Sequence, residues 1–284
     1  MACTKNNLHL SNRYLHTNAT TAAFYQDPTV LCWLWHVFRR ASDLMLIQKQ
    51  NLSVRASNVA FLRLVRMKTP EEQDLTLYPD NNFATCPIYA IALVLLMQLV
   101  PSTRLLDQLP LLATQDLTRT GSSIPFVELL EHGAIAQSAV SDEHPTKAEN
   151  TLGIRTYANR LLARTASATG ITSDFSPHSF RRGGAQYAMD IRSRCVELEH
   201  HKIFAYVFNT TAEGQKVARV LSGWNANDTM QITDLAGFDV ATQSKIAAVQ
   251  ARAFSSCSEL RTLAFNASDQ VLGILLAHLI KHYL

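Results

Sequence analysis

The sequence has few cysteines, few charged residues and no long hydrophobic run. Its five cysteines are an odd number, lie far apart and include no Cys-x-x-Cys pair, which argues against a disulfide framework and against a zinc knuckle. We therefore expect an intracellular, reducing environment. The most apolar stretch, residues 88–100, is shorter than the about 20 residues that a membrane span needs. We expect a buried helix there and no membrane partner.

Motifs of several enzyme classes are also missing. The chain has no glycine-rich dinucleotide fingerprint, no P-loop and no Gly-x-Ser-x-Gly elbow, so we expect no organic cofactor and no small-molecule substrate. Glu199-His200-His201 lacks the spacing of a zinc site, and we expect no metal. The net charge of +3 is too small to indicate a nucleic-acid partner without further signals.

The stretch Ser176–Tyr187 carries the clearest functional signal. Pro177 follows a serine, which predicts the start of a helix, and places His178 and Arg181 on one face near its N-terminus. Free N–H groups and the helix dipole favour anions there. The pair Gly183-Gly184 would cost about 1 kcal/mol per residue relative to alanine, which is tolerable where another backbone comes close. A phosphate site and a surface helix start with a stray histidine both fit this pattern.

The remaining pattern predicts a mainly helical α+β fold with a small antiparallel β-sheet. Alternating apolar residues predict strands, apolar runs predict buried helices, and the first 24 residues, which are polar, are expected to be irregular. The expected elements are a central helix over 28–40 capped by Asp27, strands over 58–68 and 75–78, and helices over 88–100, 147–168, 177–194, 215–221 and at the C-terminus.

Two short segments resemble the arginine boxes of the tyrosine recombinases, the phage-integrase-type site-specific recombinases. His178-Ser179-Phe180-Arg181 is similar to their His-x-x-Arg box, and the glycine pair after it is closest to the eukaryotic mobile-element enzymes, the Crypton and DIRS-like recombinases. Arg40-Ala41-Ser42-Asp43-Leu44 is similar to the first arginine box, with Asp43 in place of the glutamate that supports the arginine. Arg39 and Arg40 can also be explained as cations at the C-terminal end of a buried helix.

Two further positions follow the same family order. Lys68 at the predicted hairpin tip resembles the lysine that reaches the cleaved DNA step, and Trp224 resembles the tryptophan or histidine that binds the scissile phosphate. A turn lysine is otherwise a solvated charge, and a tryptophan after a glycine is otherwise a core anchor. The resemblance assigns residues 1–26 to a polar N-terminal tail, 27–245 to the catalytic-like domain and 246–284 to a C-terminal helical segment.

The resemblance implies a DNA-binding protein of recombination and integration in the nucleus, acting on duplex DNA and able to form a homo-oligomer on it. Arg40 and Arg181 would hold the phosphate, and Trp224 would position it. Lys68 would protonate the leaving oxygen, and His178 would exchange a proton with the nucleophile. No metal or cofactor is needed for this chemistry.

The family nucleophile, a tyrosine, has no counterpart at the expected place. Thr233 stands there, and the only tyrosine after Trp224 is Tyr283 near the C-terminus. A threonine hydroxyl is harder to ionise and to expel than a phenol of pKa near 10. We therefore expect impaired strand cleavage in a decayed or domesticated mobile-element recombinase. Tyr283 is the alternative candidate for the nucleophile. A non-catalytic DNA-binding module and a protein-interaction module are the alternatives.

Overall fold

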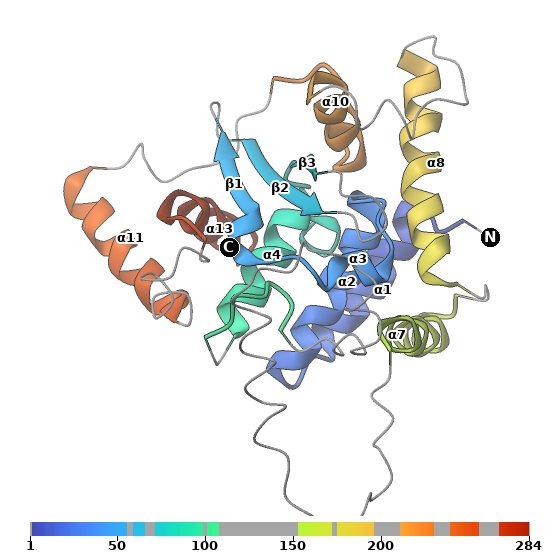
Figure 1. Ribbon diagram of the computed structural model, residues 1–284, viewed down its shortest axis with the longest axis horizontal. Coiled ribbons are helices and arrows are strands. Elements are labelled where there is room, and N and C mark those ends of the chain that lie inside the picture. Colours follow the sequence, from blue (N-terminus) through green and yellow to red (C-terminus); the bar gives the residue numbers. More distant parts are fainter. Residues whose placement is uncertain are drawn as a thin grey trace, which may run out of the picture.

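The computed structural model describes residues 2–55, 59–65, 72–98, 101–107, 153–171, 175–195, 211–229, 239–255 and 267–283. These residues are mostly helical and include a three-stranded antiparallel sheet, which confirms the predicted α+β class (Figure 1). None of the described helices is long and apolar enough to cross a membrane.

The strands are β1 (Leu52–Arg55), β2 (Val59–Val65) and β3 (Glu72–Leu77). The helices are α1 (Lys5–Thr17), α2 (Gln26–His36), α3 (Ala41–Leu44), α4 (Pro87–Met97), α7 (Ile154–Thr169), α8 (Pro177–Cys195), α10 (Thr211–Leu221), α11 (Val240–Ala253) and α13 (Asp269–Tyr283), with the short 3-10 helices η1 (Ala22–Tyr25), η2 (Lys49–Asn51) and η4 (Phe83–Thr85).

The sheet has the order β1-β2-β3, and β2 pairs antiparallel with both neighbours. Leu62 of β2 lies opposite Leu52 on one side and Leu75 on the other. Successive side chains of a strand point to opposite faces. Leu62 accordingly joins the main core, whereas Phe61 joins a second cluster that includes Ala218 of α10. The predicted antiparallel pairing of β2 with β3 is confirmed, although β3 begins at Glu72, before the predicted strand over 75–78, and the predicted turn lies outside the described residues. Strand β1, only four residues long, was not predicted.

Helix α2 lies at the centre of the molecule, between α1, α4 and α8 (Figure 1). All of its residues are buried, as its apolar sequence predicts. The predicted N-cap at Asp27 is wrong, because Asp27 lies inside the first turn. Its buried carboxylate accepts hydrogen bonds from Tyr157 and Arg164 of α7. The helix also ends at His36, before the predicted Arg40.

The prediction of an irregular N-terminal tail is wrong, because residues 5–17 form α1. Thr4 caps this helix by accepting a hydrogen bond from the backbone N–H of Asn7. The buried stripe contains two polar residues, Ser11 and Asn12, beside its leucines, which weakens the hydrophobic pattern. Asn12 is satisfied by donating to the carbonyl of Ala84, 2.7 Å away. Residues 3–15 thus contribute to the same core as α2.

Helix α13 closes the core beside the sheet. It packs on α4 and on β1, and it buries a run of apolar residues that ends at Ala277. The predicted C-terminal helix is therefore confirmed, and it docks on the core of its own chain. The boundary predicted between residues 245 and 246 falls inside α11. The helix predicted over 88–100 is present as α4, which begins at Pro87 with Cys86 as its N-cap and ends at Met97.

Candidate functional site

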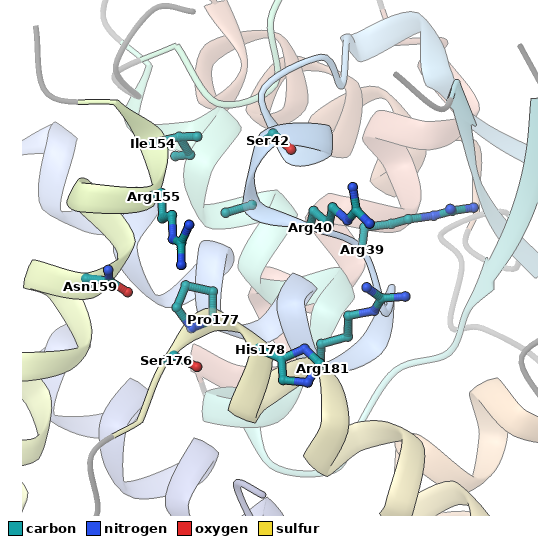
Figure 2. A pocket seen from close by; sticks show the side chains of 11 residues that line it. Arg39, Arg40, Ser42, Ile154, Arg155, Asn159, Ser176, Pro177, His178 and Arg181 are labelled. Atoms are coloured by element: carbon teal, nitrogen blue, oxygen red, sulfur yellow. The ribbon is translucent and has the colours of Figure 1, made fainter. Parts of the chain in front are cut away.

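A pocket with a volume of about 580 Å³ lies where α3, α7 and α8 begin. We call it the basic pocket (Figure 2). Its described lining carries four arginines and a histidine and no carboxylate: Arg39, Arg40, Ala41, Ser42, Ile154, Arg155, Asn159, Ser176, Pro177, His178 and Arg181.

One side of the basic pocket is built by the turn between α2 and α3. Phe38 has a positive φ of 54°, a left-handed conformation that costs a non-glycine residue about 1 kcal/mol or more. Phe38 is buried and its ring lies against α8, which holds it in this conformation. The turn leaves Arg39 buried and Arg40 exposed. Arg40 therefore begins α3 instead of ending α2.

Asp43 supports Arg40, but through the backbone. Its carboxylate accepts a hydrogen bond from the Arg40 backbone N–H at 3.2 Å. The Asp43 backbone N–H in turn donates to the Arg40 carbonyl at 3.0 Å. No ion pair between the two side chains is found in the described part of the chain. Asp43 thus fixes the start of α3, and the Arg40 guanidinium extends from that fixed point.

The start of α8 forms the floor of the basic pocket. Pro177 occupies its first position, as predicted, because a proline there loses no helical hydrogen bond. The Ser176 backbone N–H donates to the Ser179 hydroxyl at 3.1 Å, and the Ser179 N–H donates to the Ser176 carbonyl at 2.8 Å. The cap therefore uses the Ser176 backbone and the Ser179 hydroxyl. His178 is exposed and Arg181 half-buried, and both line the pocket.

The two glycines of α8 allow two other backbones to come close, as predicted. A Cβ on Gly183 would lie 2.0 Å from the Cys3 carbonyl oxygen, and one on Gly184 would lie 2.3 Å from the Trp35 carbonyl oxygen. The Cys3 N–H also donates to the Ser179 carbonyl at 2.9 Å. Close contact with α2 fixes the distance between the Arg40 turn and the start of α8.

Helix α7 forms the opposite side of the basic pocket, and its anchor is Asp27. Burial raises the pKa of the Asp27 carboxyl, against the opposing effects of hydrogen bonds from Tyr157 and Arg164. Burial and the neighbouring Asp27 raise the pKa of the Tyr157 phenol far above its ordinary value. Arg164 also lies over the ring of Phe24, 5.3 Å from its centroid. Arg164 thus holds α7 on α2.

Three of the predicted site residues come together: Arg40, His178 and Arg181 all line the basic pocket. In Figure 2 the side chains of Arg40 and Arg181 lie on the same side of the pocket, with His178 at its floor. Lys68 lies outside the described residues, between the paired strands β2 and β3. Thr233 also lies outside them.

Trp224 and Tyr283 are placed elsewhere. The Trp224 indole N–H donates to the Pro79 carbonyl at 2.7 Å, and Trp224 is not among the residues that line the basic pocket. Nearby, the Arg219 guanidinium lies 4.9 Å from the ring centroid of Tyr78. Trp224 thus ties the end of α10 to the segment after β3. Tyr283 is the last residue of α13.

The basic pocket also contains residues without a counterpart in the resemblance, above all Arg155 and Asn159. They lie four positions apart and therefore on one face of α7. The sequence places Arg155 on the polar side of the helix predicted over 147–168. It contains no signal for the elements that this side of the helix faces across the basic pocket. No group of three metal-binding side chains occurs among the described residues, and Glu199-His200-His201 lies outside them.

The comparisons with known proteins give no match: no family model fits the chain, and neither a curated protein nor a solved structure is similar to it.

Proposed function

We propose that this chain binds duplex DNA through its phosphates at the basic pocket, as a protein of the tyrosine recombinase type. One observation carries the proposal. Arg40 and the pair His178 and Arg181 lie far apart in the sequence, yet they line one pocket without a described carboxylate. These are the positions that resemble the two arginine boxes of that family. The first turns of α7 and α8 also lack acidic residues, which favours an anion there.

The proposed chemistry follows from the two guanidinium groups. Arg40 and Arg181 donate paired hydrogen bonds to the non-bridging oxygens of one phosphate. Charge grows on these oxygens when the phosphorus becomes pentacoordinate, so the same donors stabilise the transition state. His178 is placed to exchange a proton with the attacking or leaving oxygen. In this proposal, the protein is a mobile-element recombinase or its domesticated descendant, acts in the nucleus and can form oligomers on DNA.

A second candidate, a non-catalytic DNA-binding module, is favoured by Trp224. Its indole donor is used by the Pro79 carbonyl and is not free for a phosphate in this arrangement. The threonine at position 233 points the same way, since the family chemistry needs a phenol there. Both candidates share the phosphate site and differ only in strand cleavage.

Salt-dependent binding to duplex DNA tests the shared part. We expect the observed affinity of the wild type to fall steeply with salt, because each neutralised phosphate releases counterions. Arg181→Ala should weaken binding, and the Arg40/Arg181 double alanine variant, which removes both cations from the shared phosphate, should also flatten the salt slope by about 0.9. Arg160→Ala is the matched control, because Arg160 is exposed on α7 outside the basic pocket. Equal binding by the wild type and an Arg40/Arg181 double alanine variant would favour a protein-interaction module.

Covalent trapping on a nicked suicide duplex tests strand cleavage. We expect no adduct from the wild type and an adduct from Thr233→Tyr, which would show an intact phosphate site that lacks only its nucleophile. A wild-type adduct that disappears in Tyr283→Phe would instead make Tyr283 the nucleophile and contradict the expected loss of cleavage.

A further inference from the structure

The basic pocket is larger than one phosphate group requires. Its volume of about 580 Å³ lies within the about 300–1,000 Å³ of pockets that hold whole small molecules, and a single phosphate group is much smaller than such a ligand. The cationic side chains are also divided between two sides. Figure 2 shows Arg40 and Arg181 on one side and Arg155 reaching into the pocket from α7 on the other. A ligand with a single phosphate would leave one side unused.

The Arg155 side is free to bind a ligand. The Arg155 side chain is exposed, and it makes no ion pair or hydrogen bond within the described part of the chain. Asn159, one turn later on the same face, is exposed and lines the same pocket. The amide of Asn159 can donate to an oxygen that the Arg155 guanidinium also approaches.

The position of Arg155 is fixed by the fold. Tyr157 and Arg164, on other faces of α7, both bind the buried carboxylate of Asp27 on α2. Ile154, beside Arg155, is buried in the main core. The first turn of α7 is thus held in place on both sides of Arg155, so little backbone entropy is lost when a ligand binds.

Part of the lining of the basic pocket is apolar. Ala41, Ile154 and Pro177 line it among the charged residues, and Figure 2 shows Pro177 between Arg155 and Arg181. A lining with both cationic and apolar residues suits a nucleic-acid strand, in which phosphates alternate with sugars. A free phosphate ion would make no use of the apolar part.

We propose that Arg155 and Asn159 form a subsite for a second phosphate, adjacent along the same DNA strand to the phosphate held by Arg40 and Arg181. The intervening deoxyribose lies over Pro177. This inference rests on the proposed DNA-binding function and names the unit that the site recognises: two successive phosphates of one strand. Arg155 acts here as a binding residue.

The slope of the binding constant against salt reports how many phosphates the protein neutralises. It therefore distinguishes one phosphate shared by all the arginines from two separate phosphates. Affinity for a duplex of fixed length is measured over a range of salt for the wild type, Arg155→Ala, Arg181→Ala and the double variant. Arg155→Ala should weaken binding about tenfold and reduce the salt slope by about one, and the double variant should lose both contributions. Asn159→Ala should weaken binding without changing the slope, because it removes no charge. Thermal unfolding of each variant checks the fold.

Three results would count against the inference. If Arg155→Ala binds like the control Arg160→Ala, Arg155 does not contact DNA. If Arg155→Ala weakens binding but leaves the salt slope unchanged, all the arginines share one phosphate. The same conclusion follows if the Arg155/Arg181 double variant binds no more weakly than Arg181→Ala. If the wild type itself shows no salt-dependent binding, the proposed function fails and the subsite with it. In the first two cases, a flatter slope in the Arg40/Arg181 double alanine variant would leave the proposed function standing.

Discussion

Replacing Gly184 with alanine sets two effects of opposite sign against each other. Alanine is the better helix former by about 1 kcal/mol, so helix propensity alone predicts a more stable protein. The added Cβ, however, would lie 2.3 Å from the Trp35 carbonyl oxygen and 3.0 Å from Cε1 of Phe38. To open the first distance from 2.3 Å to 3.0 Å, α8 would have to move about 0.7 Å away from α2.

The packing effect should win. Extra methyl groups in a well-packed interior cost about 1–3 kcal/mol, and a backbone carbonyl inside a fully buried helix cannot rotate away as a side chain can. A Cβ only 2.3 Å from a carbonyl oxygen puts this change in the upper part of that range, about 2–3 kcal/mol. After subtracting the propensity gain of about 1 kcal/mol, we expect Gly184→Ala to lower the free energy of unfolding by about 1–2 kcal/mol. For a chain of this size the melting temperature should fall by about 2–8 °C.

Gly273→Ala is the matched control, because Gly273 also lies within a helix. Its added Cβ would meet only the side-chain oxygen of Gln250, at an ordinary contact distance of 3.6 Å. We expect this variant to gain about 0.5–1 kcal/mol. Urea unfolding of both variants measures the two signs. Because α8 and the end of α2 position Arg181 and Arg40, the proposed function predicts that Gly184→Ala also weakens DNA binding. A Gly184→Ala protein as stable as the wild type would refute the close approach of α8 and α2.

Two further predictions concern Trp224 and His278. Trp224→Phe removes the hydrogen bond to Pro79 and should lower the free energy of unfolding by about 1–2 kcal/mol. The affinity for DNA should stay unchanged, and a large loss of affinity would show that the indole contacts DNA. Burial, followed by the charges of Lys281 and His282, lowers the pKa of His278 to about 4, so the unfolded chain takes up a proton that the folded chain does not. Stability should therefore fall as the pH is lowered from about 6.5 to about 4, with His278 contributing up to about 1.4 kcal/mol per pH unit. Denaturant unfolding at several pH values should show a shallower dependence for His278→Leu; an unchanged dependence would contradict a buried neutral imidazole.

Local signals in the sequence were sufficient for many elements. The starts of α4 and α8 follow from Pro87 and Pro177, because proline fixes the backbone of a first helical turn without losing a hydrogen bond. The pairing of β2 with β3 follows from alternating apolar residues. Gly183-Gly184 predicted a close backbone contact before its partners were known. Each of these inferences needs only neighbouring residues.

Elements that depend on distant partners could not be predicted. Helix α1 buries Ser11 and Asn12, and the amide of Asn12 is satisfied by a carbonyl at residue 84. Asp27 has the sequence pattern of a helix cap, but its partners lie on α7. A buried polar group must find its hydrogen bond wherever the fold provides one, and no local pattern specifies that place.

The candidate site also combines features that local sequence signals indicate with features that only the tertiary structure decides. Through the family resemblance, the sequence by itself proposed which residues could bind a phosphate: Arg40, which it placed at the end of a helix, and His178 and Arg181 near the start of another. Only the tertiary structure decided that these residues share one pocket, that Arg155 joins them, and that the Trp224 donor is used by Pro79. The physical reason is that a single side chain carries its own charge and hydrogen-bonding capacity, whereas a phosphate site needs several cations in one place. That convergence is set by how α2, α7 and α8 pack.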